Sequence, residues 1–145
     1  MPYGRHRSLS ISGMYRHEVR VRYGDCDMQK VVFNAHYLAY SDDAVMCWFS
    51  ARLGERVHEF DCMLKTVNVV WHRPLRLGDT AQLDCTVKRW GNSSFDVFIS
   101  GHVAGEPSFD TTIVYVSTTP GAPQVVPVPN WVRAALLQDE QLATL

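Results

Sequence analysis

The apolar positions near the start of the chain alternate and then change period. Val19, Val21 and Tyr23 share one parity and charged residues occupy the other, as expected of a strand with one buried face. From residue 34 to residue 53 the chain is instead broadly apolar with a short polar patch, and Gly54 supplies a stop signal. The pattern predicts a strand, a short junction and a long helix.

Further along, the pattern predicts four more strands and a short helix. Residues 62–71 are extended, and because both parities are mixed we expect both faces to contact protein. Turn signals at residues 78–79, 91–93 and 105–107 separate the next alternating segments. Four prolines then exclude regular structure until a final amphipathic helix. The later strands are expected near residues 81–88, 95–99 and 111–117, and the helix is expected to begin near Asn130 and to dock through Trp131, Ala134, Ala135 and Leu137.

This order of elements predicts an α+β fold. Consecutive antiparallel strands leave an apolar face that needs cover, and the chain offers one long helix for that purpose. We expect an antiparallel five-stranded sheet wrapped around a long central helix, plus a short C-terminal helix. Residues 1–13 are polar and basic and are expected to be a disordered tail, with residues 14–145 forming a single domain.

Composition excludes several classes of function. The 14 basic and 15 acidic residues give a net charge of −1, which disfavours nucleic-acid and membrane partners. The four cysteines and six histidines are scattered without a zinc-binding spacing, so no metal or cofactor is expected. No export signal is recognisable, and reduced cysteines in a cytoplasmic protein are the expectation.

Two carboxylates, Asp25 and Asp27, lie at the junction of the first strand and the long helix. The first backbone N–H groups of a helix have no intrahelical partner, and they carry the positive end of the helix dipole. The junction therefore combines a potential base or nucleophile with potential donors to an oxyanion. If the chain stays extended through Cys26, the two carboxylates lie about 7 Å apart on one face.

The stretch RVRYGDCDMQKVVFNAHY, residues 20–37, resembles the signature of the 4-hydroxybenzoyl-CoA thioesterase family of hotdog-fold acyl-CoA thioesterases. A looser similarity extends through WHRPLRLGDTAQLDCTVKRWGNSSFDV. The resemblance implies a hotdog fold, thioester hydrolysis, and a homodimer or dimer of dimers, hence a homotetramer, with active sites at the dimer interface.

The same resemblance assigns roles to residues of the motif. It places the catalytic aspartate at Asp27 and the backbone oxyanion donors at Phe33, Asn34 and Ala35. The sequence departs from the family twice: Lys30 stands where a glycine is usual, and Asn34 and His36 have exchanged places in N-A-H-Y.

Roles for the neighbouring side chains follow from general chemistry. We expect Asn34 to cap the helix and so orient the donors. His36 is expected to be a satisfied polar residue that can also donate to the thioester oxygen or protonate the leaving thiolate. Asp25 is expected to cap, or to pair with Arg22 or Lys30.

Coenzyme A carries phosphates and an adenine, so its site should combine basic and aromatic side chains. Lys88, Arg89 and Trp90, with Ser94 in the adjoining turn, are the predicted substrate-binding residues, and Arg73 and Arg76 stand behind them.

The sequence thus predicts hydrolysis of an acyl-CoA, or of an acyl-carrier-protein thioester, with Asp27 as general base or as nucleophile through a mixed anhydride. Two alternatives stay open. One is a hotdog dehydratase or hydratase that pairs Asp27 with His36, and the other is a non-catalytic acyl-thioester-binding protein.

Overall fold

The computed structural model describes residues 14–143, with side chains described as far as Leu137. The predicted tail, residues 1–13, lies outside the described residues. The elements, in chain order, are β1 (Tyr15–Arg20), the 3₁₀ turn η1 (Tyr23–Asp25), α1 (Asn34–Leu53), the 3₁₀ segment η2 (Gly54–Glu59), β2 (Asp61–Trp71), β3 (Thr80–Trp90), β4 (Ser94–Val103), β5 (Glu106–Thr118) and α2 (Asn130–Ala143).

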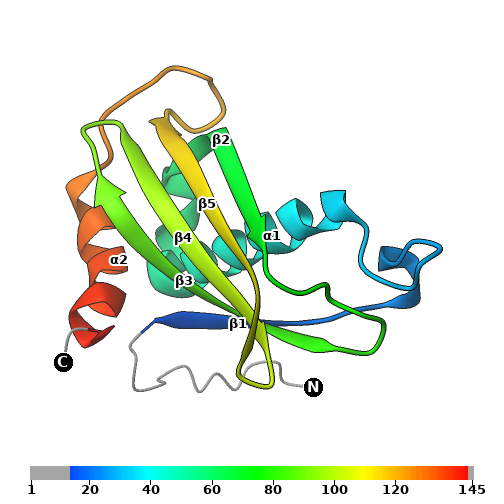
Figure 1. Cartoon of the computed structure of the whole chain (residues 1–145). Coiled ribbons are helices and arrows are strands. Elements are labelled where there is room, and N and C mark those ends of the chain that lie inside the picture. The colour runs from blue at the N-terminus through cyan, green and yellow to red at the C-terminus, as the bar shows by residue number, and fades with distance from the viewer. Residues whose placement is uncertain (1–13, 144–145) are drawn as a thin grey trace.

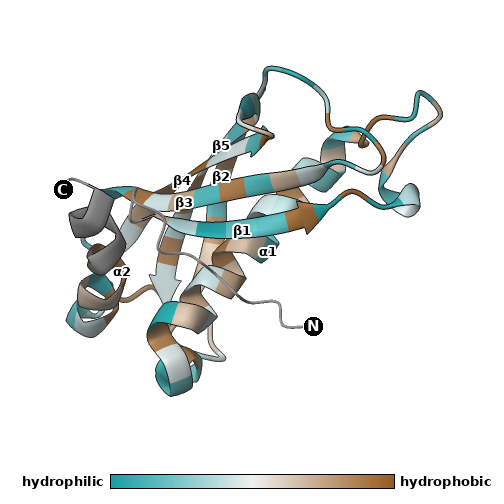
Figure 2. Cartoon of the chain, turned by 90° about the horizontal axis from the view of Figure 1, so that it is seen from below, coloured by the Kyte–Doolittle hydropathy of each residue, from teal (hydrophilic) through white to brown (hydrophobic). Residues whose placement is uncertain are grey.

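The five strands form one antiparallel sheet in the order β1-β3-β4-β5-β2. The sheet curves around α1, which lies against one face of the sheet (Figures 1 and 2). The C-terminal helix α2 contacts both α1 and β3. The expected α+β architecture is confirmed. β1 and β2 are the two edges, and each is paired on one side only.

The core lies between α1 and the concave face of the sheet. Along β4, Phe95, Val97 and Ile99 are all buried, as their alternation predicts. Trp48 of α1 is fully buried in the same core, and truncating such a side chain typically costs about 3–5 kcal/mol. The buried residues of α1 recur at helical spacing: Tyr37, Ser41, Ala44, Val45, Trp48, Phe49 and Leu53.

The predicted bounds of α1 are confirmed. The helix ends at Gly54, whose φ of 60° lies in the region that glycine tolerates. No helix of the described residues is long and apolar enough to cross a membrane.

Two details of the sequence interpretation are wrong. The first strand ends at Arg20, and Tyr23 is 85% exposed in η1 because the chain turns before reaching it. In α2 the buried residues are Val132 and Leu136, one helical turn apart, whereas Ala134 is exposed. β2, the segment expected to contact protein on both faces, is an edge strand and is largely exposed in the single chain.

Candidate active site

Asp27 lies in a tight turn that connects η1 to α1. Cys26 and Val32 form an isolated antiparallel bridge, and the Asp27 N–H donates to the Val31 carbonyl at 2.9 Å. The Oδ1 atom of Asp27 accepts a hydrogen bond from the Gln29 N–H at 2.8 Å. The carboxylate is exposed, and no described residue donates to its second oxygen. The turn therefore orients Asp27 and leaves one oxygen available to water or substrate.

The turn closes at Lys30, whose φ of 66° is left-handed. The Lys30 N–H donates to the Asp27 carbonyl at 2.9 Å. A side chain in this region crowds the backbone, whereas glycine does not. The departure from the family at Lys30 thus falls at a position where the backbone itself favours glycine.

Asp25 is held by hydrogen bonds. Its Oδ2 atom accepts from the Tyr40 hydroxyl at 2.7 Å and from the Arg22 N–H at 3.0 Å. Burial acts to raise the pKa of Asp25, but these two bonds and the charges of Arg22 and His36 outweigh it, so the pKa lies below its ordinary value. The contact to Arg22 agrees with the expected capping role. Cys26, between the two aspartates, is extended (φ −100°, ψ 149°), as assumed for their spacing of about 7 Å.

The start of α1 differs from expectation in its cap. Phe33 is the N-cap residue and Asn34 the first helical residue, and no side chain caps the helix. The Phe33 N–H donates to the Asp25 carbonyl at 3.0 Å, so it is already occupied. The N–H groups of Asn34 and Ala35 have no backbone partner among the described residues. Of the three predicted oxyanion donors, these two are the available ones.

His36 is half-buried on the first turn of α1, edge-on to the Phe33 ring at 6.1 Å between centroids.

A pocket of ≈ 260 Å³ opens beside this junction. Asn34 and Tyr37 line it from α1, and Trp71 and Arg73 from the end of β2 and the loop that follows. Tyr37 is buried, and its hydroxyl accepts the Leu75 N–H at 2.9 Å, which ties this loop to the helix. The remaining lining residues are Val31, Val32, His72 and Pro74.

The predicted coenzyme A residues lie elsewhere. β3 begins at Thr80, opposite Arg20, and its last residue, Trp90, is ten residues further on, about 30 Å of strand from the Asp27 end. Arg89 is bound to Asp96 through two hydrogen bonds of 2.8 and 3.0 Å and to Ser94. Lys88 lies over the Phe98 ring at 3.9 Å. These residues do not surround Asp27 within one protomer.

Sequence reasoning missed Tyr40 as the hydroxyl partner of Asp25 and Trp71 as a pocket residue, and it named Arg73 only as a secondary basic residue of the coenzyme A site. Tyr40 is partly buried and packs against the core, while its hydroxyl donates to Asp25. A tyrosine two helical turns after a carboxylate-bearing junction was the available signal. No sequence signal pointed to Trp71, because its place in the pocket depends on where β2 ends.

Comparison with known proteins identifies the family. The model of the thioesterase-like superfamily matches residues 21–136, so the chain belongs to this superfamily. No curated protein matches the chain.

Solved structures agree in fold. A thioesterase superfamily protein from Jannaschia sp. CCS1 has a TM-score of 0.79 at 22% identity, covering 85% of this chain and 90% of its own. A 1,4-dihydroxy-2-naphthoyl-CoA thioesterase from Synechocystis has a TM-score of 0.73 at 18% identity, covering 83% and 93%. A thioesterase from Thermus thermophilus, solved with coenzyme A and Zn, has a TM-score of 0.75 at 25% identity, covering 90% and 94%. The hotdog fold implied by the resemblance is confirmed.

Proposed function

We propose that the protein hydrolyses an acyl-CoA thioester to a free acid and coenzyme A. The observation that carries the proposal is the Asp27 turn. It presents an exposed carboxylate with one unengaged oxygen just before a helix whose first two N–H groups lack backbone partners among the described residues. Membership of the thioesterase-like superfamily supports the reaction class.

The chemistry needs an in-line nucleophile and donors to the carbonyl oxygen. In one route, Asp27 takes a proton from water, the water oxygen attacks the thioester carbon, and the thiolate leaves. In the other, the Asp27 carboxylate attacks the thioester carbon and the C–S bond breaks to expel the thiolate, after which water cleaves the mixed anhydride to the free acid and the Asp27 carboxylate. The N–H groups of Asn34 and Ala35 would bind the oxyanion in both routes. A single turnover in ¹⁸O-labelled water separates them, because only the anhydride route can leave label in the Asp27 carboxylate.

The phosphates of coenzyme A need nearby positive charge. Arg76 forms an isolated bridge with Val31, which places it against the Asp27 turn, and Arg73 lines the pocket. Lys30 is exposed on the turn itself. We propose these three residues as the phosphate contacts, in preference to Lys88, Arg89, Trp90 and Ser94.

We further propose that the active site is completed by a second copy of the chain. β2 is an edge strand of 11 residues, and an exposed apolar edge is a template for pairing with another strand. Along it, Met63, Val67 and Trp71 are 51%, 36% and 48% exposed. Because Trp71 lines the pocket, pairing of two β2 strands would bring the partner beside the substrate. The molar mass from light scattering also shows whether two such dimers associate into a tetramer.

Light scattering across a dilution series tests the pairing. Val67→Lys introduces a repelling charge on the edge and is expected to yield monomers with reduced activity. Val125→Lys is the matched control, since Val125 is 58% exposed but lies outside the strands. A Val67→Lys protein that remains a fully active dimer contradicts this interface.

The reaction class is tested with a panel of aliphatic and aromatic acyl-CoAs and acyl-carrier-protein thioesters, followed by release of free thiol. Thiol release from at least one member is expected. Turnover of enoyl or 3-hydroxyacyl esters without thiol release indicates a dehydratase or hydratase, and tight binding without turnover indicates a binding protein. Either result overturns the proposal.

A cytoplasmic location completes the proposal. Cys26, Cys47 and Cys62 are free thiols, which suits a reducing compartment.

A further inference from the structure

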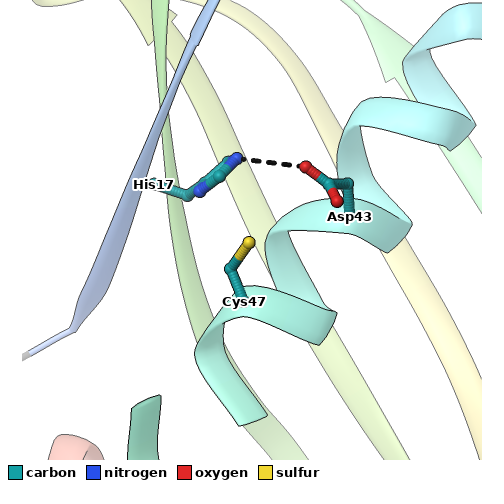
Figure 3. Close-up of side chains that lie close together, drawn as sticks. All are labelled: His17, Asp43 and Cys47. Atoms are coloured by element: carbon teal, nitrogen blue, oxygen red, sulfur yellow. Dashed lines mark ion pairs between the residues drawn. The ribbon is translucent and has the colours of Figure 1, made fainter. Parts of the chain in front are cut away.

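Three potential metal ligands of different types meet between β1 and α1. His17 projects from β1 toward the helix, and Asp43 and Cys47 project from α1 toward the strand (Figure 3). Their ligand atoms all lie within 4.8 Å of one another. His17 Nε2 lies 3.5 Å from Asp43 Oδ2. Among the described residues, no other group of three or more such side chains gathers in this way.

Local geometry explains why the three side chains meet. Along β1, His17 shares its parity with the buried Tyr15 and with Val19, which packs against the core. Its side chain therefore faces the helix instead of solvent. Asp43 and Cys47 are four residues apart, so they project from one face of α1, one turn apart. The scattered spacing in the sequence hides this arrangement, because one ligand comes from a strand and two from a helix.

An ion pair alone accounts for the arrangement poorly. The Asp43 side chain is 68% exposed, and a contact of this kind contributes little to stability. Cys47 adds almost nothing to such a pair, since a thiol is a weak donor and acceptor. Imidazole, carboxylate and thiolate together are instead the ligand types that Zn²⁺ prefers.

The distances suit a tetrahedral ion after a small adjustment. Zinc bonds of about 2.0–2.3 Å place neighbouring ligand atoms roughly 3.3–3.8 Å apart. The observed spread of 4.8 Å requires a contraction of about 1 Å. His17 Nε2 and Asp43 Oδ2 are already 3.5 Å apart, so the contraction falls on the distances to the Cys47 sulfur. The exposure of Asp43 leaves a path for the ion and for a water as fourth ligand.

We propose that His17, Asp43 and Cys47 form a Zn²⁺ site that fastens the edge strand β1 to α1. The ion is held by the His17 imidazole, the Asp43 carboxylate, the Cys47 sulfur and one water. On binding, the Cys47 thiol loses its proton to solvent and no electron is transferred. The site is separate from the Asp27 turn, because Asp43 is nine residues beyond Asn34, about 14 Å along the helix axis. Its role is structural, since β1 is paired with the sheet only through β3.

Cobalt titration tests the site directly. Untagged full-length protein, stripped with a chelator, is titrated with Co²⁺ and then with Zn²⁺. We expect a thiolate-to-cobalt charge-transfer band that saturates at one ion per chain and disappears when Zn²⁺ displaces the cobalt. Excess Zn²⁺, at 100-fold its Kd, should raise the unfolding midpoint by roughly 5–10 °C.

Substitutions assign the ligands. Cys47→Ser should abolish the charge-transfer band, and Asp43→Asn and His17→Gln should each weaken binding at least tenfold. Cys62→Ser and His58→Ala are the matched controls and should bind normally, because neither residue lies in the cluster. Asp43→Asn changes an exposed side chain, so it should fold even if a substitution of the more buried Cys47 does not.

Three results would overturn the proposal: absence of the band, a band that survives in Cys47→Ser, or loss of the band in Cys62→Ser instead. Normal binding by Asp43→Asn and His17→Gln would likewise show that the ion is held elsewhere.

Discussion

Replacing Lys30 with glycine should stabilise the protein. The left-handed φ of 66° strains a residue with a Cβ by about 1–2 kcal/mol. Glycine removes this strain but gives the unfolded chain extra conformational freedom, which cancels about 0.4–1 kcal/mol of the stabilisation. The net expectation is a gain of about 1 kcal/mol, or about 2–4 °C in the unfolding midpoint at this chain length. Thermal unfolding at fixed protein concentration measures it.

Two control variants separate backbone strain from the loss of the lysine charge. Lys30→Ala removes the amine but keeps the Cβ, so its midpoint should stay near that of the wild type. Ala104→Gly relieves a similar left-handed conformation, φ 50°, in the β4–β5 turn and should give a comparable gain. The reasoning fails if Lys30→Gly is neutral while Ala104→Gly stabilises, or if Lys30→Ala stabilises as much as Lys30→Gly.

Two further predictions concern stability. Since the pKa of Asp25 is lowered in the folded protein, its ionised form stabilises the fold above the ordinary carboxyl pKa, and this contribution is lost as pH falls through the folded value. The stability difference between wild type and Asp25→Asn should therefore shrink from pH 7 toward acid pH in urea titrations, and a constant difference would contradict the role given to the Tyr40 bond. Gly101→Ala should destabilise the protein by about 1–3 kcal/mol, because the added Cβ would meet the Phe109 ring at 2.4 Å, and an unchanged midpoint would contradict this packing.

The sequence predicted the elements that have a strong local signal. Alternation in β4 and the apolar run from Asn34 to Gly54 reflect burial along a single element, so the pattern fixes them. β2 has apolar residues on both parities, and in the single chain several of them are exposed at a sheet edge. An apolar residue that binds a partner chain and one that packs in the core give the same pattern in the sequence.

For the site, the sequence identified the Asp27 junction but not its surroundings. The Tyr40 bond to Asp25 spans 15 residues and depends on how η1 folds back over the helix. The pocket depends on the loop after β2, which only the sheet order brings to the helix start. The basic and aromatic run ending at Trp90 looked suited to coenzyme A, yet β3 carries it to the opposite end of the sheet.

The most direct test of the account is the rate of thiol release by Asp27→Asn, with Asp25→Asn as the matched control. On the best acyl-CoA of the panel, we expect Asp27→Asn to lower kcat/KM by about 10²- to 10⁴-fold while the variant stays folded. Asp25→Asn removes a carboxylate that is already hydrogen-bonded to Tyr40, so it should lower kcat/KM far less. Undiminished hydrolysis by Asp27→Asn, or a larger loss in Asp25→Asn, would contradict the assignment of Asp27 as the catalytic carboxylate.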